Sequence, residues 1–356
     1  MDDKLLETRQ EEGKPLVTVV TITFNLIAKK REAYIKQCIE SVHNQTYCCI
    51  EHIIIDGASN DGTLELLKQY QDRNYIKVYS SPDKGIYDAM NKGIARANGK
   101  YINFLNSDDF FHNKEAVKIS VKYLEETAAD YSFADAMLLY EDGKEYLWEG
   151  DVSKLLWGSH YCHQTMFVRT DLLKKVGGFD ISYKISADTE MMIRLYAQKA
   201  IYVKVPSCIV SYRVGGYSSQ NQLQSRIDHS TAFYKSIGKD IGLSVNDCFL
   251  CWNQSFFDEL PKNQQLELIL KIPLEYGQEY LLREFVARMH VSSEMLSNKW
   301  YYLFGFVPIV NCEYKGNKRY LRLFGILNIL ISVEYKRKKK FYLLGVLPVL
   351  KVKRYI

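Results

Sequence analysis

Acidic and polar side chains that could bind a metal ion and a phosphate recur at the ends of apolar segments. The densest set, Asn106-Ser107-Asp108-Asp109, directly follows the apolar run of residues 101–105. Carboxylates are ligands that hard divalent cations prefer, and such a cation binds phosphate oxygens in turn. In open α/β sheets, ligands bind outside the carboxyl ends of strands. If residues 101–105 form a strand, the two aspartates are placed to hold a cation and, through it, a phosphate.

The segments around this set alternate between strand and helix patterns. Residues 16–25 and 51–57 are rich in β-branched and apolar side chains, as in strands covered on both faces, and residues 76–79 and 101–105 predict two more strands. Apolar residues at helical spacing predict helices over 35–42, from 63 onward and over 86–97. This alternation predicts right-handed βαβ crossovers and a mainly parallel α/β sheet. Gly99 is expected to end the last of these helices with a positive φ.

Polar residues at successive strand ends are therefore expected along one rim of the sheet, namely Thr23, Asn25, Asp56, Asp61, Asp83, Asp108 and Asp109. Any one of them alone could be an ordinary turn residue or helix cap. Their coincidence at four strand ends indicates a ligand site instead. A dinucleotide-binding dehydrogenase shares the alternation, but residues 25–29, NLIAK, lack the glycines of its phosphate turn, so that class is disfavoured.

Three of these segments closely resemble the N-terminal half of family 2 glycosyltransferases: VTVVTITFN, HIIIDGASNDGT and SSPDKGIYDAMNKGIARANGKYINFLNSDD. The resemblance implies the GT-A fold, a Rossmann-like sheet flanked by helices, and a nucleotide-diphosphate sugar as the donor. It also implies that Thr23, Asn25 and Asp56 contact the nucleotide and that Asp83 lies beside the base or the sugar.

The same resemblance assigns Mg²⁺ or Mn²⁺ and the donor diphosphate to the acidic pair. Asn106 stands where the family often has Asp. Asp109, with Asp108 in support, is therefore the preferred metal ligand, and Asp108 also remains a donor contact.

Residues 157–220 resemble the acceptor half of the family, in which a Glu-Asp pair opens a helix and its Asp is the catalytic base. Asp188 keeps the position of the base, whereas Ala187 replaces the Glu. We expect Glu190 or His163 to supply what the missing carboxylate does. A helix cap for Asp188 and a structural role for His163 are the competing interpretations.

Two further candidates are assigned to the acceptor or donor side. Arg194 lies on the helix that Asp188 opens, and Ser218 belongs to the segment YRVGGYSS, which resembles a glycine-rich loop that closes over the donor in related enzymes. A plain surface loop is the alternative. The Gln-x-x-Arg-Trp motif of processive members is absent, so transfer of a single sugar per encounter is expected.

Composition divides the chain into a polar extension (1–14), the GT-A domain (15–225), a helical extension (226–298) and a basic aromatic tail (299–356). The tail carries 13 Lys or Arg against 2 Asp or Glu, whereas residues 1–298 carry a net charge of −6. Three 20-residue repeats, marked by LFGFVPI, LFGILNI and LLGVLPV, each predict a strand, a glycine turn and a strand. The tail is either a packed β subdomain or a contact for an anionic membrane surface.

The location expected from the sequence is cytoplasmic, with peripheral attachment to the inner face of the cytoplasmic membrane. The first 14 residues are polar and show no signal-peptide pattern, and no apolar run approaches the roughly 20 residues that span a bilayer. The eight scattered cysteines are interpreted as reduced thiols.

The sequence thus predicts an inverting glycosyltransferase of surface polysaccharide synthesis. It would move one hexosyl or N-acetylhexosaminyl residue to a hydroxyl of a glycan or lipid-linked acceptor. A catalytically inactive nucleotide-sugar-binding scaffold at the membrane surface is the alternative, suggested by Ala187 and Asn106. A nucleic-acid-binding protein is suggested only by the tail, and the acidic balance of residues 1–298 disfavours it.

Overall fold

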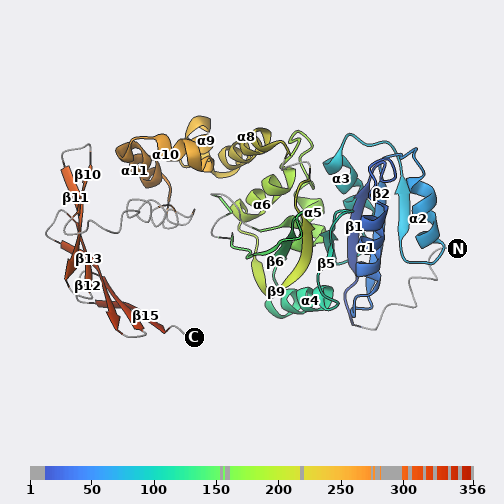
Figure 1. Ribbon diagram of the computed structural model, residues 1–356, viewed down its shortest axis with the longest axis horizontal. Coiled ribbons are helices and arrows are strands. Elements are labelled where there is room, and N and C mark those ends of the chain that lie inside the picture. Colours follow the sequence, from blue (N-terminus) through green and yellow to red (C-terminus); the bar gives the residue numbers. More distant parts are fainter. Residues whose placement is uncertain are drawn as a thin grey trace. The chain divides into compact units, whose positions relative to one another are not determined.

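A computed structural model describes residues 13–152, 155–156, 161–216, 220–273, 276 and 281, and the strands between residues 299 and 353. The chain falls into two compact units, Met1–Asn253 and Gln254–Ile356. Each unit is described by itself, and the helices and strands are labelled in Figure 1.

Four parallel strands form the first half of the main sheet. They are β1 (Val17–Thr23), β2 (Ile50–Asp56), β3 (Lys77–Ser80) and β4 (Tyr101–Phe104). β1 lies between β2 and β4, β3 pairs with the outer edge of β2, and Thr23 is level with Asp56 at the carboxyl ends. Every residue of β2 is buried, and its polar residues Glu51, His52 and Asp56 all have hydrogen-bond partners. The strands and their parallel pairing confirm this part of the predicted fold.

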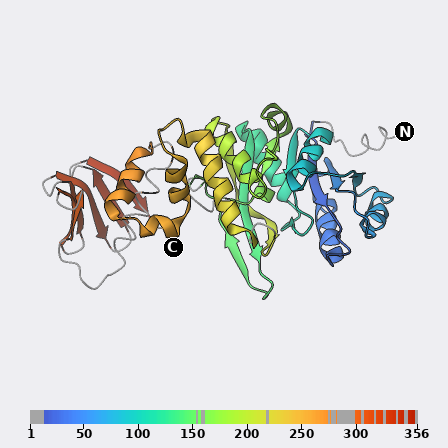
Figure 2. The same ribbon diagram turned by 90° about the horizontal axis from the view of Figure 1, so that it is seen from above.

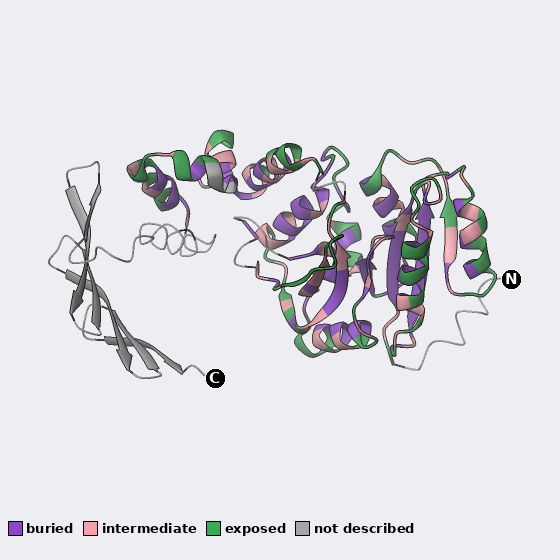
Figure 3. Cartoon of the chain, in the orientation of Figure 1, coloured by how far each residue is buried: buried purple, intermediate pink, exposed green. Residues whose placement is uncertain are grey.

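Helices pack on both faces of these strands. α1 (Glu32–His43), α2 (Thr63–Gln71) and α4 (Ala116–Thr127) share one hydrophobic core with Val19 of β1. Val20, on the opposite face, packs against α3 (Ile86–Arg96), where a Cβ added at Gly93 would lie 2.5 Å from the Val20 side chain. Figure 3 shows the result: buried strands and helices whose outer faces are exposed.

Gly99 corrects one sequence-based expectation, because its φ is not in the positive range. A Cβ at this position would instead lie 2.5 Å from the backbone nitrogen of Thr18. The glycine is therefore required by the close approach of the chain to β1 and not by the geometry of the helix end.

The second half of the sheet is mixed. β5 (Phe110–Phe111), β6 (Tyr131–Leu139), β7 (Glu145–Trp148), β8 (Phe167–Arg169) and β9 (Tyr202–Arg213) complete the order β3-β2-β1-β4-β8-β6-β9-β5, with β7 on β6. β8 is antiparallel to β4 and β6, whereas β9 is parallel to β6. β8 begins at the rim where β4 ends, so it runs back along the sheet without a helical crossover. The β6–β7 hairpin extends outward in Figure 2.

The described helices of this half of the unit include α5 (Thr170–Lys175), α6 (Ala187–Ala197), α8 (Gln222–Phe233) and α9 (Val245–Trp252). A π-helical turn, η4 (Tyr234–Gly238), joins α8 to the segment before α9. α6 and α8 pack together, and Asp228 of α8 accepts hydrogen bonds from the backbone nitrogens of Ile185 and Ser186 just before α6. α8 thereby fixes the loop that leads into Asp188.

The described residues of the second unit include two short helices and an antiparallel sheet. The helices are α10 (Gln254–Glu259) and α11 (Lys262–Lys271). The strands are β10 (Lys299–Leu303), β11 (Val307–Lys315), β12 (Lys318–Leu323), β13 (Leu327–Tyr335), β14 (Lys338–Leu343) and β15 (Leu347–Lys353), paired in chain order. β11, β13 and β15 begin 20 residues apart, as the sequence repeat predicts.

The repeat also appears in the strand pairing. The register shifts between Tyr301 and Tyr302, and again at the residues 20 and 40 positions later. Pro308 and Pro348 pair with the residues just after the first and last of these shifts, where an irregular ladder tolerates a missing backbone donor. The strands of the predicted repeat are confirmed, whereas its turn glycines lie outside the described residues.

Candidate active site

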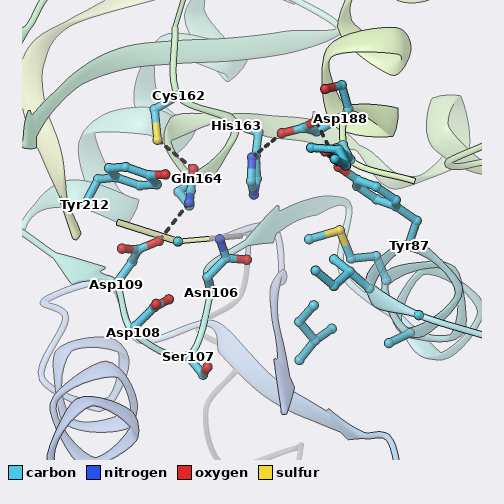
Figure 4. Close-up of a pocket in the computed structure, with 18 of the residues that line it drawn as sticks. Tyr87, Asn106, Ser107, Asp108, Asp109, Cys162, His163, Gln164, Asp188 and Tyr212 are labelled. Atoms are coloured by element: carbon cyan, nitrogen blue, oxygen red, sulfur yellow. Dashed lines mark hydrogen bonds and ion pairs between the residues drawn. The ribbon is translucent and has the colours of Figure 1, made fainter. Parts of the chain in front are cut away.

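A cavity of about 900 Å³ opens at the carboxyl ends of β1, β2 and β4, a size that suits a sugar nucleotide. The sequence-predicted residues that line it are Thr23, Asp83, Asp108, Asp109, His163 and Asp188. Others lie near the rim or elsewhere without lining it, namely Asn25, Asp56, Asp61, Glu190 and Arg194. Ser218 lies outside the described residues. Figure 4 shows the acidic pair and Asp188 on opposite sides of this space.

Asp56 ties three strand ends together. Its Oδ1 accepts hydrogen bonds from Thr23 Oγ1 at 3.0 Å and Ser59 Oγ at 2.6 Å. Its Oδ2 accepts from Ser59 N at 2.9 Å and Ser80 Oγ at 2.8 Å. The carboxylate is fully buried and four donors occupy it, so in this structure Asp56 organises the rim of β1, β2 and β3 and does not face the cavity.

Asn25 shapes the turn after β1. It has a φ of +49°, a conformation that Asn tolerates better than most residues. Its side-chain oxygen accepts a hydrogen bond from Asn60 N at 3.1 Å, and its own backbone nitrogen donates to Ser59 Oγ at 2.8 Å.

The preceding Phe24 lines the cavity with 52% of its surface exposed, and Lys29 Nζ lies 5.1 Å from its ring centre. Sequence reasoning missed Phe24, because a single aromatic residue after a strand carries no pattern.

Asp83 and Gly57 are placed against each other at the rim. Asp83 Oδ1 accepts a hydrogen bond from Gly85 N at 2.9 Å. A Cβ at position 57 would lie 2.7 Å from Asp83 Oδ2. Glycine at this position therefore leaves room for the Asp83 carboxylate beside the end of β2.

The two aspartates of the acidic pair differ in their surroundings. Asp109 is 1% exposed; its Oδ1 accepts from Arg213 N at 2.9 Å and its Oδ2 from Gln164 Nε2 at 2.7 Å. Burial, and next the negative charge of Asp108, hold the pKa of Asp109 well above its usual value. Asp108 is only partly buried; its Oδ2 accepts from Arg31 Nη1 at 3.1 Å.

The two aspartates also differ in how far protein donors occupy their oxygens, which bears on their use as metal ligands. Protein donors already occupy both oxygens of Asp109, whereas Oδ1 of Asp108 accepts no hydrogen bond from the described residues. Nowhere in the described part of the chain do three His, Cys, Asp or Glu side chains gather as a complete metal site. The pair fits a cation such as Mg²⁺, which is commonly held by one or two carboxylates together with substrate phosphates and water.

Arg31 and Arg213 supply positive charge beside the acidic pair, and Lys29 lines the same cavity. Arg213, at the end of β9, donates through Nη1 to the backbone oxygen of Asp108 and through Nη2 to Gln37 Oε1 at 2.6 Å. Its guanidinium carbon lies 4.2 Å from the ring centre of Tyr34. These contacts orient a fixed cation beside the proposed diphosphate site. Sequence analysis placed Arg213 in the segment YRVGGYSS but did not single it out, because its contacts with the acidic pair join residues far apart in the chain.

At the other side of the cavity, Asp188 belongs to a hydrogen-bonded group with His163 and Tyr87 (Figure 4). His163 Nδ1 lies 2.8 Å from Asp188 Oδ2. Tyr87 Oη, which also donates to the backbone oxygen of Ile185, lies 3.2 Å from Asp188 Oδ1, and Thr189 N donates to the same oxygen at 2.9 Å. Burial alone would raise the pKa of Asp188, but the hydrogen bond and charge of His163 outweigh it and lower the pKa to about 2.

Glu190 and Arg194, expected on the acceptor or donor side, do not take part in this group and pair with each other instead. Arg194 Nε and Nη2 bind the two carboxylate oxygens of Glu190 at 2.8 and 2.9 Å. Arg194 also donates to the backbone oxygens of Val176 and Gly178. This pair ties α6 to the turn before it. Of the two residues expected to compensate for Ala187, it is His163 that contacts Asp188.

The family model "Glycosyl transferase family 2" matches residues 18–185, which span the nucleotide rim, the acidic pair and His163. The chain is 34% identical over 185 residues to an uncharacterized glycosyltransferase of Mycobacterium tuberculosis, covering 51% of this chain and 68% of that protein. It is 26% identical over 212 residues to a PGL/p-HBAD biosynthesis glycosyltransferase of Mycobacterium bovis, covering 58% of this chain and 80% of that protein. A putative teichuronic acid biosynthesis glycosyltransferase of Bacillus subtilis, TuaG, is 35% identical over 132 residues, covering 36% of this chain and 50% of TuaG.

Solved structures share the fold. Residues 1–349 of TarS from S. aureus superpose with a TM-score of 0.51 at 15% identity, covering 86% of this chain and 96% of TarS 1–349, which has also been solved with UDP and with UDP-GlcNAc. The mannosyltransferase PcManGT from Pyrobaculum calidifontis, in complex with GDP-Man and Mn²⁺, gives a TM-score of 0.50 at 14% identity, covering 82% of this chain and 81% of PcManGT. The predicted GT-A fold is confirmed. Together, the fold and the sequence relatives place this chain in glycosyl transferase family 2.

Proposed function

We propose that this protein transfers one hexosyl or N-acetylhexosaminyl residue from a nucleotide-diphosphate sugar to an acceptor hydroxyl, with inversion at the anomeric carbon. One observation carries the proposal: a single cavity has the acidic pair on one side and the Asp188–His163 group on the other. An inverting displacement needs two such sides, one for the leaving group and one for the incoming hydroxyl. It needs no enzyme nucleophile.

The donor nucleotide is assigned to the rim of β1, β2 and β3. Phe24 offers an exposed ring face on which a base can stack, and Thr23 and Asp83 line the same part of the cavity. Asp56 and Asn25 support this surface through the contacts that join the strand ends. TarS has been solved with UDP-GlcNAc and PcManGT with GDP-Man, which supports a nucleotide-sugar donor here.

The diphosphate is assigned to Asp108, Arg31 and Arg213. Mg²⁺ or Mn²⁺ at Asp108, backed by Asp109, would neutralise charge on the leaving nucleoside diphosphate. The complex of PcManGT with Mn²⁺ supports a divalent cation. Arg31 and Arg213 lie beside Asp108 and supply further positive charge.

The acceptor hydroxyl is assigned to the side of Asp188. As its oxygen bonds to the anomeric carbon, the bond from that carbon to the phosphate oxygen breaks and its electrons leave with the nucleoside diphosphate. The hydroxyl proton passes to the group formed by Asp188 and His163, which acts as the general base. Tyr87 and Thr189 hold Asp188 in place for this step.

A glycan or lipid-linked acceptor in surface polysaccharide synthesis is the acceptor class we favour. The relatives include proteins named for PGL/p-HBAD and teichuronic acid biosynthesis. No helix in the described residues is both long and apolar enough to cross a bilayer. Contact with the inner face of the cytoplasmic membrane is therefore assigned to the basic tail.

The strand register supports such a contact. Lys315 pairs with Lys318, Lys318 with Val333, Val333 with Lys340 and Lys340 with Lys351. Four lysines thus occupy one cross-strand row of the second unit. Near an anionic leaflet, each lysine can contribute about 1 kcal/mol.

The experiment is a screen of UDP- and GDP-sugars for hydrolysis and transfer, with Mn²⁺ or with EDTA. Wild-type protein is expected to consume one donor only with the metal present, and Asp108→Asn to lose this activity while keeping its fold. Lys36→Gln, on the exposed surface of α1, is a matched control that should keep full activity. Binding of UDP without turnover of any donor would contradict the proposal and favour an inactive nucleotide-sugar-binding scaffold instead.

A further inference from the structure

The 3₁₀ turn η3 (His163–Thr165) holds His163 in a fixed position at the wall of the cavity. Asn103 of β4 donates through Nδ2 to the backbone oxygens of Gln164 at 2.8 Å and Met166 at 2.7 Å. Thr165 Oγ1 donates to the backbone oxygen of Cys162 at 2.7 Å. These buried bonds lock the turn onto the central sheet. A catalytic group on such a turn is preorganised.

The two ring nitrogens of His163 have different surroundings. Nδ1 lies 2.8 Å from Asp188 Oδ2, and a carboxylate at this distance keeps the ring proton of a neutral imidazole on Nδ1. Nε2 is then left with a lone pair. This nitrogen is buried and has no hydrogen-bond partner among the described residues. In Figure 4 it points away from Asp188 into the space above Asn106.

A buried polar atom without a partner is uncommon in proteins and is usually explained by a ligand, a water molecule or a catalytic role. Here the atom belongs to a side chain that lines the cavity assigned to the acceptor. An acceptor hydroxyl that donates to Nε2 would satisfy it.

The carboxylate of Asp188 is less available. His163 occupies its Oδ2, while Thr189 N and Tyr87 Oη both approach its Oδ1. A hydroxyl that donated directly to Asp188 would have to compete with these groups.

We propose that Nε2 of His163 takes the proton from the acceptor hydroxyl, and that Asp188 acts through His163 as a positioning residue. The inference rests on the proposed function and deepens it. As the acceptor oxygen bonds to the anomeric carbon and the nucleoside diphosphate leaves, the hydroxyl proton moves to Nε2. The resulting imidazolium is stabilised by the ionised Asp188, in the manner of a base held by a buried carboxylate.

Other titratable groups face this pair from neighbouring elements. Tyr87 on α3 contacts Asp188, and burial and the charge of Asp188 raise the pKa of Tyr87 well above its usual value, so it stays neutral. His229 on α8 acts on Asp188 through its charge. Asp109 lies beyond Gln164, the residue after His163. Their presence means that the pH test below needs variants as well as the wild-type profile.

The first test is the pH dependence of kcat in the full-length enzyme. With His163 as the base, kcat should fall on the acid side of its pH profile. His163→Gln should lower kcat by about 10²-fold or more, leave donor KM little changed and remove this acid limb. Imidazole added to His163→Ala should restore part of kcat. His112→Gln, a histidine that bonds to Ser211 and does not line the cavity, is the control and should keep the wild-type profile.

Several outcomes would overturn the inference while leaving the proposed function intact. One is a His163→Gln enzyme that transfers sugar with an unchanged acid limb. Another is a His163→Ala enzyme that imidazole does not rescue although it still binds UDP and unfolds at the wild-type temperature.

A second measurement does not depend on turnover. ¹⁵N NMR of the histidine rings at pH 7.5 should show His163 protonated at Nδ1 and bare at Nε2, and Asp188→Asn should weaken this preference. A proton on Nε2 in the wild-type protein would overturn the inference. If no donor is consumed under any condition, the proposed function fails, and the NMR result still decides which ring nitrogen is free.

Discussion

Gln164 Nε2 donates a hydrogen bond to Asp109 Oδ2 at 2.7 Å, one residue along the chain from His163. The turn η3 thereby joins the acidic pair of the donor side to the Asp188–His163 group of the acceptor side. Cys162 Sγ, 2.6 Å from Gln164 Oε1, fixes the orientation of the amide, so that its nitrogen faces Asp109.

Gln164→Leu should therefore destabilise the protein. The substitution leaves one oxygen of a buried carboxylate without its partner, at a cost of about 1–3 kcal/mol in the free energy of unfolding. Urea denaturation measures this loss. Gln224→Leu, which removes a partly buried bond to Asp228 away from the acidic pair, is the control and should cost less. Equal losses in the two variants would contradict the assigned role of Gln164.

Phe24→Ala should weaken donor binding. Stacking of a base on an aromatic ring contributes about 1–3 kcal/mol, which corresponds to a rise in the donor Kd of about 5-fold to 150-fold. Calorimetry with the nucleoside diphosphate measures the change, and Phe24→Trp should preserve affinity because it keeps a ring face. Unchanged affinity in Phe24→Ala would place the base elsewhere.

The low pKa of Asp188 predicts an effect on stability in acid. Its folded-state pKa of about 2 lies below the 3.8 of an unperturbed aspartate, so the carboxylate stabilises the fold above pH 3.8 and loses this contribution as pH falls toward 2. Between pH 6 and pH 3 the wild-type protein should lose about 1 kcal/mol more stability than Asp188→Asn. Denaturant titrations at the two pH values measure the difference, and equal losses would contradict the paired, ionised state of Asp188.

Binding of the tail to an anionic surface should depend on its row of lysines. Full-length protein is expected to co-sediment with anionic liposomes, and the variant with Lys315, Lys318, Lys340 and Lys351 changed to Gln should bind far less. Salt at 1 M should release the wild-type protein, because the screening length falls to about 3 Å.

The matched control changes Lys36, Lys68, Lys175 and Lys239 to Gln. These lysines are exposed on the first unit, so the net charge changes by the same amount. Equal binding of both variants would show that total charge, and not the row in the tail, governs the contact.

The sequence was sufficient for the parts of the fold that periodic patterns encode. Buried parallel strands appear in the sequence as largely apolar segments, and the helices between them as apolar residues at helical spacing. The strands β1 to β4 and the helices that connect them could therefore be predicted. The antiparallel pairing of β8 with β4 could not be predicted. It depends on the contact between η3 and the end of β4, which no local sequence pattern encodes.

The candidate site was predictable where motif residues lie at strand ends and not where the site is assembled from distant segments. Asp108, Asp109 and Asp188 all line the cavity. Which of the two aspartates has an oxygen without a protein donor could not be inferred from the sequence. The two donors to Asp109, Gln164 and Arg213, lie 55 and 104 positions further along the chain. The same holds for His163 and Glu190: their spacing in sequence does not reveal which one reaches Asp188.

The stereochemistry of a single turnover tests the central claim most directly. With an α-linked nucleotide sugar and Mn²⁺, ¹H NMR recorded before mutarotation should show the β-anomer of the transferred or hydrolysed sugar. The signal should be absent with EDTA and in Asp108→Asn. Release of the α-anomer, or formation of product at the same rate without a divalent cation, would contradict the account.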